Sequence, residues 1–216
     1  GHVINPNRFA APWIYPETIR TTVDGIRSEY PVCSRLPLDI LVFAEHDLGL
    51  EFDFKPIRQF GQDAFLRHDL RGIVFDNDAF AAQSVNRLRF SVAHELGHLY
   101  LHKDIYGKVR FENVEEWLDF FEQVPPDQYQ RVEWQADEFA GQLLMPVKEL
   151  SAALEETIGD AEREGYFPLG PEAVLEFCCR SMHRDFGVSQ QAMSTRLHRD
   201  KLWPHRKVAV RSGNSV

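Results

Sequence analysis

The segment from Ser84 to His102 constrains the fold of this chain more than any other, because it combines an apolar helical stripe with paired imidazoles. Its apolar residues recur every three or four positions, which is the spacing of one face of an amphipathic helix. They are Leu88, Val92, Leu96 and Leu99. Residues 94–98 read His-Glu-Leu-Gly-His. Side chains four residues apart lie on one face of a helix, so His94 and His98 are expected to point the same way.

This H-E-x-x-H pattern favours a hydrolytic zinc site. Two imidazoles one turn apart can reach one zinc ion at about 2.0–2.1 Å, with Glu95 beside the open position of the metal. A carboxylate there can accept a proton from a water whose pKa zinc lowers to about 7, and can pass it to the leaving amine. Taken alone, three fixed residues also arise by chance, so a second segment is needed to support the interpretation.

That second segment lies in a helix expected over residues 129–145, where Glu133 and Asp137 fall one turn apart. A catalytic zinc site needs a third protein ligand, and Glu133 is the candidate. Asp137 is then placed to accept a hydrogen bond from the outer nitrogen of a ligand imidazole. The alternative is two solvated acids on an exposed helix face. The first motif favours the metal site over that alternative.

His102 continues the row of His94 and His98 by one more turn and competes as the third ligand. Along a helix axis it lies about 12 Å from His94, by the rise of 1.5 Å per residue. The two cannot share one metal ion. A third His six residues after the second, another zincin arrangement, fails because position 104 is Asp. We therefore expect His102 to have a structural role.

Residues 88–102 read Leu-Arg-Phe-Ser-Val-Ala-His-Glu-Leu-Gly-His-Leu-Tyr-Leu-His, and residues 133–146 read Glu-Trp-Gln-Ala-Asp-Glu-Phe-Ala-Gly-Gln-Leu-Leu-Met-Pro. Together they resemble the ImmA/IrrE family of metallo-endopeptidases, and the likeness extends over roughly residues 38–150. The resemblance implies a zincin-like fold, zinc held by His94, His98 and Glu133, and Glu95 as general base. Members typically cleave a helix-turn-helix repressor encoded nearby and so act in transcription regulation and stress response. The resemblance therefore implies a protein substrate of that class.

Periodicity along the rest of the chain predicts an α+β fold with a small sheet packed on helices. Helices are expected from Pro16 to before Pro31 and from Leu38 to Leu48, and two or three short strands include residues 50–54 and 72–76, the latter ended by a turn at Asn77-Asp78. Residues 106–127 are expected to form a connection with a short helix at 114–121. Pro146 is expected at the first position of the next helix. Two more helices are expected at 171–186 and 189–202.

This pattern suggests four parts. They are an irregular lead-in (residues 1–15), a metallopeptidase domain (16–158), a helical C-terminal part similar to a helix-turn-helix (159–204) and a mobile tail (205–216). In the helical part, Gly187, Ser189 and Arg196 fall where a DNA-reading helix carries its turn, N-cap and basic residue. A plain amphipathic helix explains the same residues and is preferred.

The net charge of −9 and the pI near 5.5 make direct DNA binding unlikely. No apolar run is long enough to cross a membrane, and no export signal is evident at the N-terminus. Three cysteines, two of them adjacent at Cys178 and Cys179, suit a reducing compartment. A cytoplasmic location is therefore expected.

The main hypothesis is a zinc-dependent endopeptidase acting on a repressor. The alternative is a regulatory or toxin/antitoxin-type protein that keeps zinc but only binds a repressor, another partner or DNA. The sequence leaves the oligomeric state open. It also leaves open which side chain would stabilise the oxyanion, the eligible ones being Tyr100, Tyr106, Tyr129, His46, His68 and His183. The N-terminal segment or residues 104–128 are hypothesised to gate the cleft.

Overall fold

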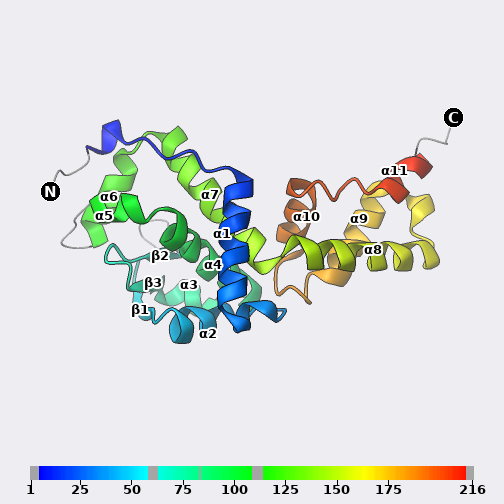
Figure 1. Cartoon of the computed structure of the whole chain (residues 1–216), viewed down its shortest axis with the longest axis horizontal. Helices are drawn as coiled ribbons and strands as arrows, with labels where there is room; N and C mark the ends of the chain where they lie inside the picture. Colours follow the sequence, from blue (N-terminus) through cyan, green and yellow to red (C-terminus); the bar gives the residue numbers. More distant parts are fainter. Residues whose placement is uncertain (1–4, 58–62, 83, 109–113, 213–216) are drawn as a thin grey trace. The chain divides into compact units, whose positions relative to one another are not determined.

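The computed structural model describes residues 5–57, 63–82, 84–108 and 114–212, and it divides the chain into two compact units (Figure 1). The first unit comprises residues 1–35 and 39–140, and the second comprises residues 36–38 and 141–216. The boundary falls inside a helix, after Ala140. From the sequence, the metallopeptidase domain is expected to end later, at residue 158.

A three-stranded mixed sheet forms the β part of the first unit. The central strand β3 (Gly72–Asp76) pairs in parallel with β1 (Glu51–Lys55) and antiparallel with β2 (Ala64–Leu66). Every residue of β2 and β3 is buried, whereas β1 is largely exposed. β2 lies against the helix that carries the H-E-x-x-H pattern, α4 (Val85–Leu101). The predicted α+β class, with a small sheet packed on this helix, is confirmed.

Helices make up the rest of the first unit and follow the predicted order. They are η1 (Pro6–Arg8), α1 (Pro16–Glu29), η2 (Pro31–Ser34), α2 (Ile40–Val42), η3 (Phe43–Asp47), α3 (Asn77–Ala82), α4, α5 (Lys103–Lys108), α6 (Val114–Gln123) and α7 (Pro126–Leu144), which continues into the second unit. α1 buries Ile19, Val23 and Ile26, the apolar positions spaced three to four apart. Ser84 caps α4 by accepting a hydrogen bond from the backbone N–H of Arg87.

Three local predictions are wrong in detail. The helix expected from Leu38 to Leu48 is a short α2 followed by a π-helical turn, η3. It begins later than expected, because Asp39 acts as the N-cap and accepts a hydrogen bond from the N–H of Val42. Asn77 and Asp78 begin α3 instead of forming a turn, because Asp76 accepts hydrogen bonds from the first N–H groups of that helix. Pro146 is the N-cap of α8 and not its first helical residue.

The regular elements of the second unit, among its described residues, are all helices. Its elements are α8 (Val147–Arg163), η5 (Phe167–Leu169), α9 (Pro171–Met182), α10 (Gln190–Arg199) and α11 (Arg206–Ser212). Ser189 caps α10 as expected, by accepting a hydrogen bond from the N–H of Ala192. Arg196, however, is buried and paired with Asp200 at 3.0 Å. A side chain held in this way is not presented to DNA.

The tail that was expected to be mobile from residue 205 contains the helix α11 up to Ser212. His205 is buried and its Nε2 lies 2.8 Å from a carboxylate oxygen of Glu155. Lys207 binds the other oxygen of Glu155 at 3.0 Å. A helix thus occupies residues 206–212 of the segment for which a mobile tail is expected, and the mobility of this segment stays a prediction.

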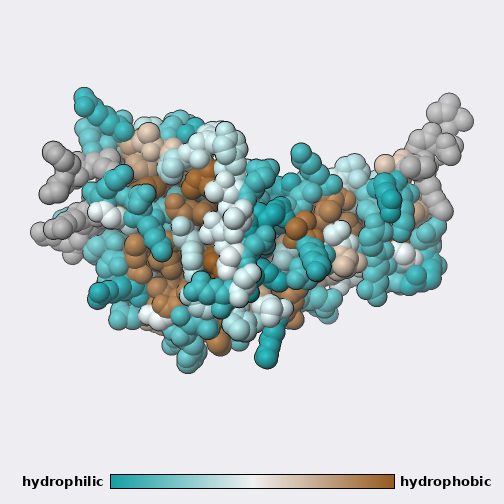
Figure 2. Space-filling model, in the orientation of Figure 1, coloured by the Kyte–Doolittle hydropathy of each residue, from teal (hydrophilic) through white to brown (hydrophobic). Residues whose placement is uncertain are grey.

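The surface drawn in Figure 2 mixes hydrophilic and apolar side chains. Among the residues that the structure describes, no helix has both the length and the apolar character needed to cross a lipid bilayer.

Candidate metal centre

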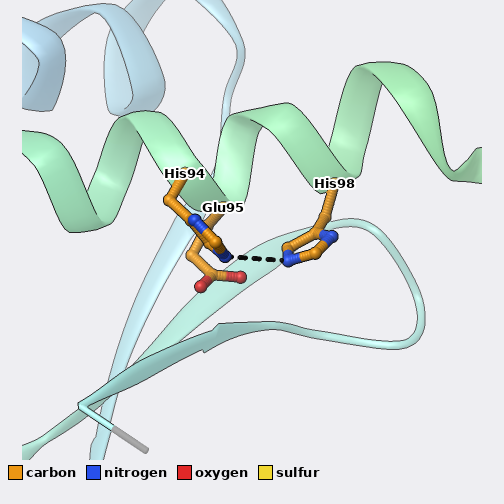
Figure 3. Close-up of side chains that lie close together, drawn as sticks. All are labelled: His94, Glu95 and His98. Atoms are coloured by element: carbon orange, nitrogen blue, oxygen red, sulfur yellow. Dashed lines mark hydrogen bonds between the residues drawn. The ribbon is translucent and has the colours of Figure 1, made fainter. Parts of the chain in front are cut away.

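α4 presents His94 and His98 from one side, one turn apart, and their imidazoles point toward each other (Figure 3). The two Nε2 atoms lie 3.1 Å apart. His98 is 7% exposed, and the side chain of His94 is 16% exposed, so the pair is accessible mainly at one edge. The helical spacing predicted from the sequence has thus placed two nitrogen donors together.

α7 brings a third donor group to this pair. The Glu133 carboxylate lies with Oε2 3.2 Å from Nε2 of His94 and Oε1 3.4 Å from Nε2 of His98. Close packing of the two helices allows this, since Gly97 of α4 contacts the backbone of Ala136 of α7. Glu133 is therefore held opposite both imidazoles although it lies 35 residues beyond His98 in the chain.

The three donors suit a tetrahedral metal ion. Ligands at about 2.0–2.1 Å from zinc in tetrahedral geometry are about 3.3 Å from one another. The two Nε2 atoms lie 3.1 Å apart, and each has one oxygen of Glu133 at 3.2 or 3.4 Å, which is close to that edge length. Two imidazoles with one carboxylate are also a zinc donor set that leaves a fourth position for a reactant. The residues present therefore fit the predicted metal.

Asp137 holds the outer nitrogen of His94. Its Oδ1 lies 2.8 Å from Nδ1 of His94. Because a carboxylate can only accept, Nδ1 carries the proton, and Nε2 is left with its lone pair toward Glu133 and His98 when the ring is neutral. This is the arrangement predicted for Asp137 from the spacing of Glu133 and Asp137.

Glu95 lies beside the imidazole pair and is anchored to the sheet. Its Oε2 accepts a 2.6 Å hydrogen bond from the backbone N–H of Leu66 in β2. Glu95 is close enough to His94 and His98 to be considered a ligand itself, since donor atoms of all three lie within 4.8 Å of one another. Glu133 is the better third ligand, because each of its oxygens faces one imidazole while Glu95 is held by β2.

The electrostatics of the site follow from burial and from these contacts. Burial lowers the pKa of His94, but its hydrogen bonds with Asp137 and Glu133 outweigh this and raise the pKa well above 6.5. Burial raises the pKa of Glu133, but its contacts with His94 and His98 hold that pKa below the ordinary value. Burial also raises the pKa of Glu95, against the opposing charges of His98 and His94.

His102, for which a structural role is expected, contacts both His98 of α4 and Gln135 of α7. Its Nδ1 lies 2.9 Å from Nδ1 of His98, and its Nε2 lies 2.9 Å from Oε1 of Gln135. Burial lowers the pKa of His102 to about 3, so its ring is neutral. The i, i+4 spacing of His98 and His102 is visible in the sequence, whereas Gln135 is joined to them only by the packing of α7 on α4.

A cleft that is open to solvent lies over the candidate metal centre. Its wall includes Ala64 and Phe65 of β2 together with aromatic side chains of three helices. These are Tyr106 of α5, Trp117 and Phe121 of α6 and Tyr129 of α7. The site is thus reached from solvent through a cleft whose wall is largely aromatic.

Of the six candidates for oxyanion stabilisation, this cleft includes Tyr106 and Tyr129. Tyr106 is 5% exposed, and burial raises its pKa, with the charges of Glu95 and Glu133 acting in the same direction. Tyr100 instead stacks on Phe139, and His183 is bonded to the carbonyl of Val188. His46 and His68 are exposed side chains outside this cleft.

A comparison with curated proteins found no match. The model of the Peptidase_M78 family, described as the IrrE N-terminal-like domain, matches residues 47–198. The matched range contains all five predicted site residues, the sheet and most of the second unit. It covers well over half of the chain, and it agrees with the resemblance to the ImmA/IrrE family noted from the two motifs. The chain therefore belongs to the Peptidase_M78 family of IrrE N-terminal-like domains.

Proposed function

We propose that this protein is a zinc-dependent endopeptidase. The observation that carries the proposal is the grouping of His94, His98 and Glu133: the two Nε2 atoms lie 3.1 Å apart, each faces one Glu133 oxygen at 3.2 or 3.4 Å, and the Glu95 carboxylate lies beside them. These three residues would hold the metal. When bound, zinc polarises the scissile carbonyl group and makes a water molecule more acidic.

The remaining chemistry belongs to side chains of this chain. Glu95 accepts a proton from the attacking water and passes it to the departing amine nitrogen. Its hydrogen bond from the Leu66 N–H fixes the carboxylate in place. Its raised pKa suits a group that must both take and release a proton near neutral pH. The phenols of Tyr106 and Tyr129 are the groups in the cleft wall that can donate a hydrogen bond to the developing oxyanion.

We further propose that the substrate is a helix-turn-helix transcriptional repressor, cleaved at one or a few peptide bonds in the cytoplasm. The likeness of the two motifs to the ImmA/IrrE family supports this. The cleft supports a peptide substrate, because it is open and has apolar walls formed by Phe65, Trp117 and Phe121. Arg196, the basic residue that suggested DNA reading, is buried, which favours a protein over DNA as the partner.

The test is cleavage of candidate repressors from the same genomic neighbourhood by the zinc-loaded protein and by Glu95→Gln. Losing the general base is expected to slow cleavage about 10²–10⁴-fold. Zinc content should stay at the wild-type level, because Glu95 is not one of the three ligands. Glu122→Gln is a matched control, since Glu122 is an exposed acid of α6 that does not line the cleft.

The outcomes separate the enzyme from the alternative. If wild type binds zinc and a repressor but leaves it intact, and Glu95→Gln behaves identically, the protein is a non-catalytic binding protein. If wild type takes up no zinc after metal addition, the proposed centre itself is wrong. Cleavage that survives Glu95→Gln would exclude the assigned general base.

A further inference from the structure

Hydrogen bonds connect the candidate metal centre to the N-terminal segment in front of α1. His98 contacts His102, His102 contacts Gln135, and the Nε2 of Gln135 donates a 2.7 Å hydrogen bond to the carbonyl oxygen of Pro12. His102 is 1% exposed and Gln135 is also 1% exposed. The three contacts therefore form a chain that begins at a partly buried bond to a backbone carbonyl, passes through two buried side chains and ends at a predicted metal ligand.

The direction of every bond in this chain follows from its first member. The carbonyl of Pro12 can only accept, so the amide nitrogen of Gln135 must face it and the Gln135 oxygen must face His102. That oxygen can only accept, so Nε2 of His102 carries the proton. A neutral His102 then has its lone pair on Nδ1, where it accepts a hydrogen bond from Nδ1–H of His98.

The consequence for His98 is a fixed tautomer. With its proton on Nδ1, the lone pair lies on Nε2, the atom that faces His94 and Glu133. Asp137 imposes the same tautomer on His94 directly through a carboxylate. His98 has no carboxylate in that place, and the buried chain supplies the same control through neutral groups.

The N-terminal segment that supplies the carbonyl is itself held along α7, and in Figure 1 it passes beside this helix before α1 begins. The Ala11 N–H donates a 2.9 Å hydrogen bond to Oε1 of Gln128, and the Arg131 guanidinium lies 4.7 Å above the Trp13 ring. Gln128, Arg131 and Gln135 lie on one side of α7, three and four residues apart. The position of Pro12 relative to Gln135 is therefore determined by contacts on both sides of it.

We propose that His102 and Gln135 are positioning residues that transmit the placement of the Pro12 carbonyl to His98 and thereby strengthen metal binding at the candidate centre. The inference rests on the proposed function for the identity of the metal ligands. It extends that function by making the N-terminal segment part of the metal site. Outer partners of ligand imidazoles typically contribute about 10–100-fold to metal affinity.

The experiment measures zinc affinity by competition with a chromophoric chelator, using zinc alone as the probe. His102→Phe removes the acceptor for His98, and Gln135→Leu removes both hydrogen bonds of the amide. Each is expected to weaken zinc binding about 10–100-fold. His102→Asn restores an acceptor near the Nδ1 position and should recover most of that loss. Gln130→Leu is the matched control, because Gln130 is an exposed residue of the same helix and is not part of the chain of bonds.

A second measurement concerns the metal-free protein. The ¹⁵N shifts of its imidazoles should show the proton of His98 on Nδ1 in wild type and a mixture of tautomers in Gln135→Leu. Circular dichroism and thermal unfolding without metal establish that each variant is folded. A purely structural role for His102 would lower the stability of the metal-free protein and leave zinc affinity and tautomer unchanged.

The two proposals fail in different ways. Zinc affinities of His102→Phe and Gln135→Leu within twofold of wild type, with an unchanged His98 tautomer, would overturn the positioning role. If wild type binds zinc but cleaves nothing, the proposed function fails while the affinity series still decides the positioning role. If wild type binds no zinc, the metal-binding part of the inference fails with the proposed function.

Discussion

Gly97 of α4 and Ala136 of α7 are in direct contact, and a Cβ atom built on Gly97 would lie 2.9 Å from the Cα atom and 3.0 Å from the carbonyl oxygen of Ala136. Real Cβ atoms essentially never come closer than 3.0 Å to another heavy atom. On α7, Glu133 lies three residues before Ala136 and Asp137 directly follows it. The close approach at this glycine therefore sets how near their carboxylates come to the imidazoles of α4.

Gly97→Ala is expected to destabilise the fold and weaken metal binding together. The added methyl group would overlap the backbone of Ala136, so the two helices must move apart. The free energy of unfolding is expected to fall by about 1–3 kcal/mol. The separation of α4 and α7 should also lower zinc affinity, because Glu133 moves away from His94 and His98. Denaturant unfolding of the metal-free protein and chelator competition measure the two effects.

Gly25→Ala is the control for this change. Gly25 lies within α1, where an added Cβ meets no atom within 4 Å. Alanine there should raise the free energy of unfolding by about 0.4–1 kcal/mol. If Gly97→Ala proves as stable as Gly25→Ala and binds zinc normally, the close approach does not determine the geometry of the site.

The site residues were predictable because each lies in a strong helical pattern with a readable spacing. His94 and His98 are paired by the four-residue interval, and so are Glu133 and Asp137. α4 and α7 are long helices, so their faces could be assigned from the sequence alone. The prediction that these two faces meet rested on the chemistry of zinc ligands and not on periodicity.

The features of the fold and the candidate site that were not predicted depend on contacts between distant residues or on single side chains, which a local sequence pattern does not reveal. Strand β2 is only three residues long, and its role in holding Glu95 through the Leu66 N–H arises from its position in the sheet. The Pro12 carbonyl meets Gln135 across 123 positions of the chain. Asn77 begins a helix because the Asp76 side chain caps it, although the dipeptide Asn-Asp is equally typical of turns.

Replacing Glu133 and Asp137 by alanine should have graded effects on zinc binding. Asp137→Ala removes the partner of His94 Nδ1 and is expected to weaken binding about 10–100-fold. Glu133→Ala removes a donor whose two oxygens face both imidazoles, so its loss should be larger than that of Asp137→Ala. Elemental analysis after dialysis and chelator competition give the order of the two affinities. Equal retention of zinc by both variants would contradict Glu133 as a ligand.

The two phenols in the cleft can be separated by removing each hydroxyl group. Tyr106→Phe and Tyr129→Phe keep the aromatic wall, so substrate and zinc affinities should change little. The variant that loses the oxyanion donor is expected to lower kcat about 10²–10³-fold. Tyr106 lines the cleft together with Glu95 and Glu133, and burial and these charges raise the pKa of its phenol and so favour the protonated form that donates, which makes it the stronger candidate. If both variants keep wild-type kcat, the donor is a group outside this pair.

Zinc affinity is expected to increase with pH through the neutral range. In the metal-free protein, hydrogen bonds with Asp137 and Glu133 outweigh burial and raise the pKa of His94 well above 6.5. Below that raised pKa the imidazole carries a proton on Nε2, which zinc must displace, so binding releases one proton and the affinity gains about tenfold per pH unit. Above it, no proton is released from His94 and the dependence flattens.

Because the raised pKa of His94 depends on Asp137 and Glu133, a variant of Asp137 serves as the control for this pH profile. Asp137→Ala removes the hydrogen bond that raises the pKa of His94 most, so the flat region should begin at a lower pH than in wild type. Calorimetric titrations of zinc in buffers of different ionisation enthalpy count the protons released at each pH. A wild-type zinc affinity that does not change between pH 6 and 8 would show that zinc displaces no proton from His94. An Asp137→Ala profile identical to that of wild type would show that Asp137 does not raise the pKa of His94.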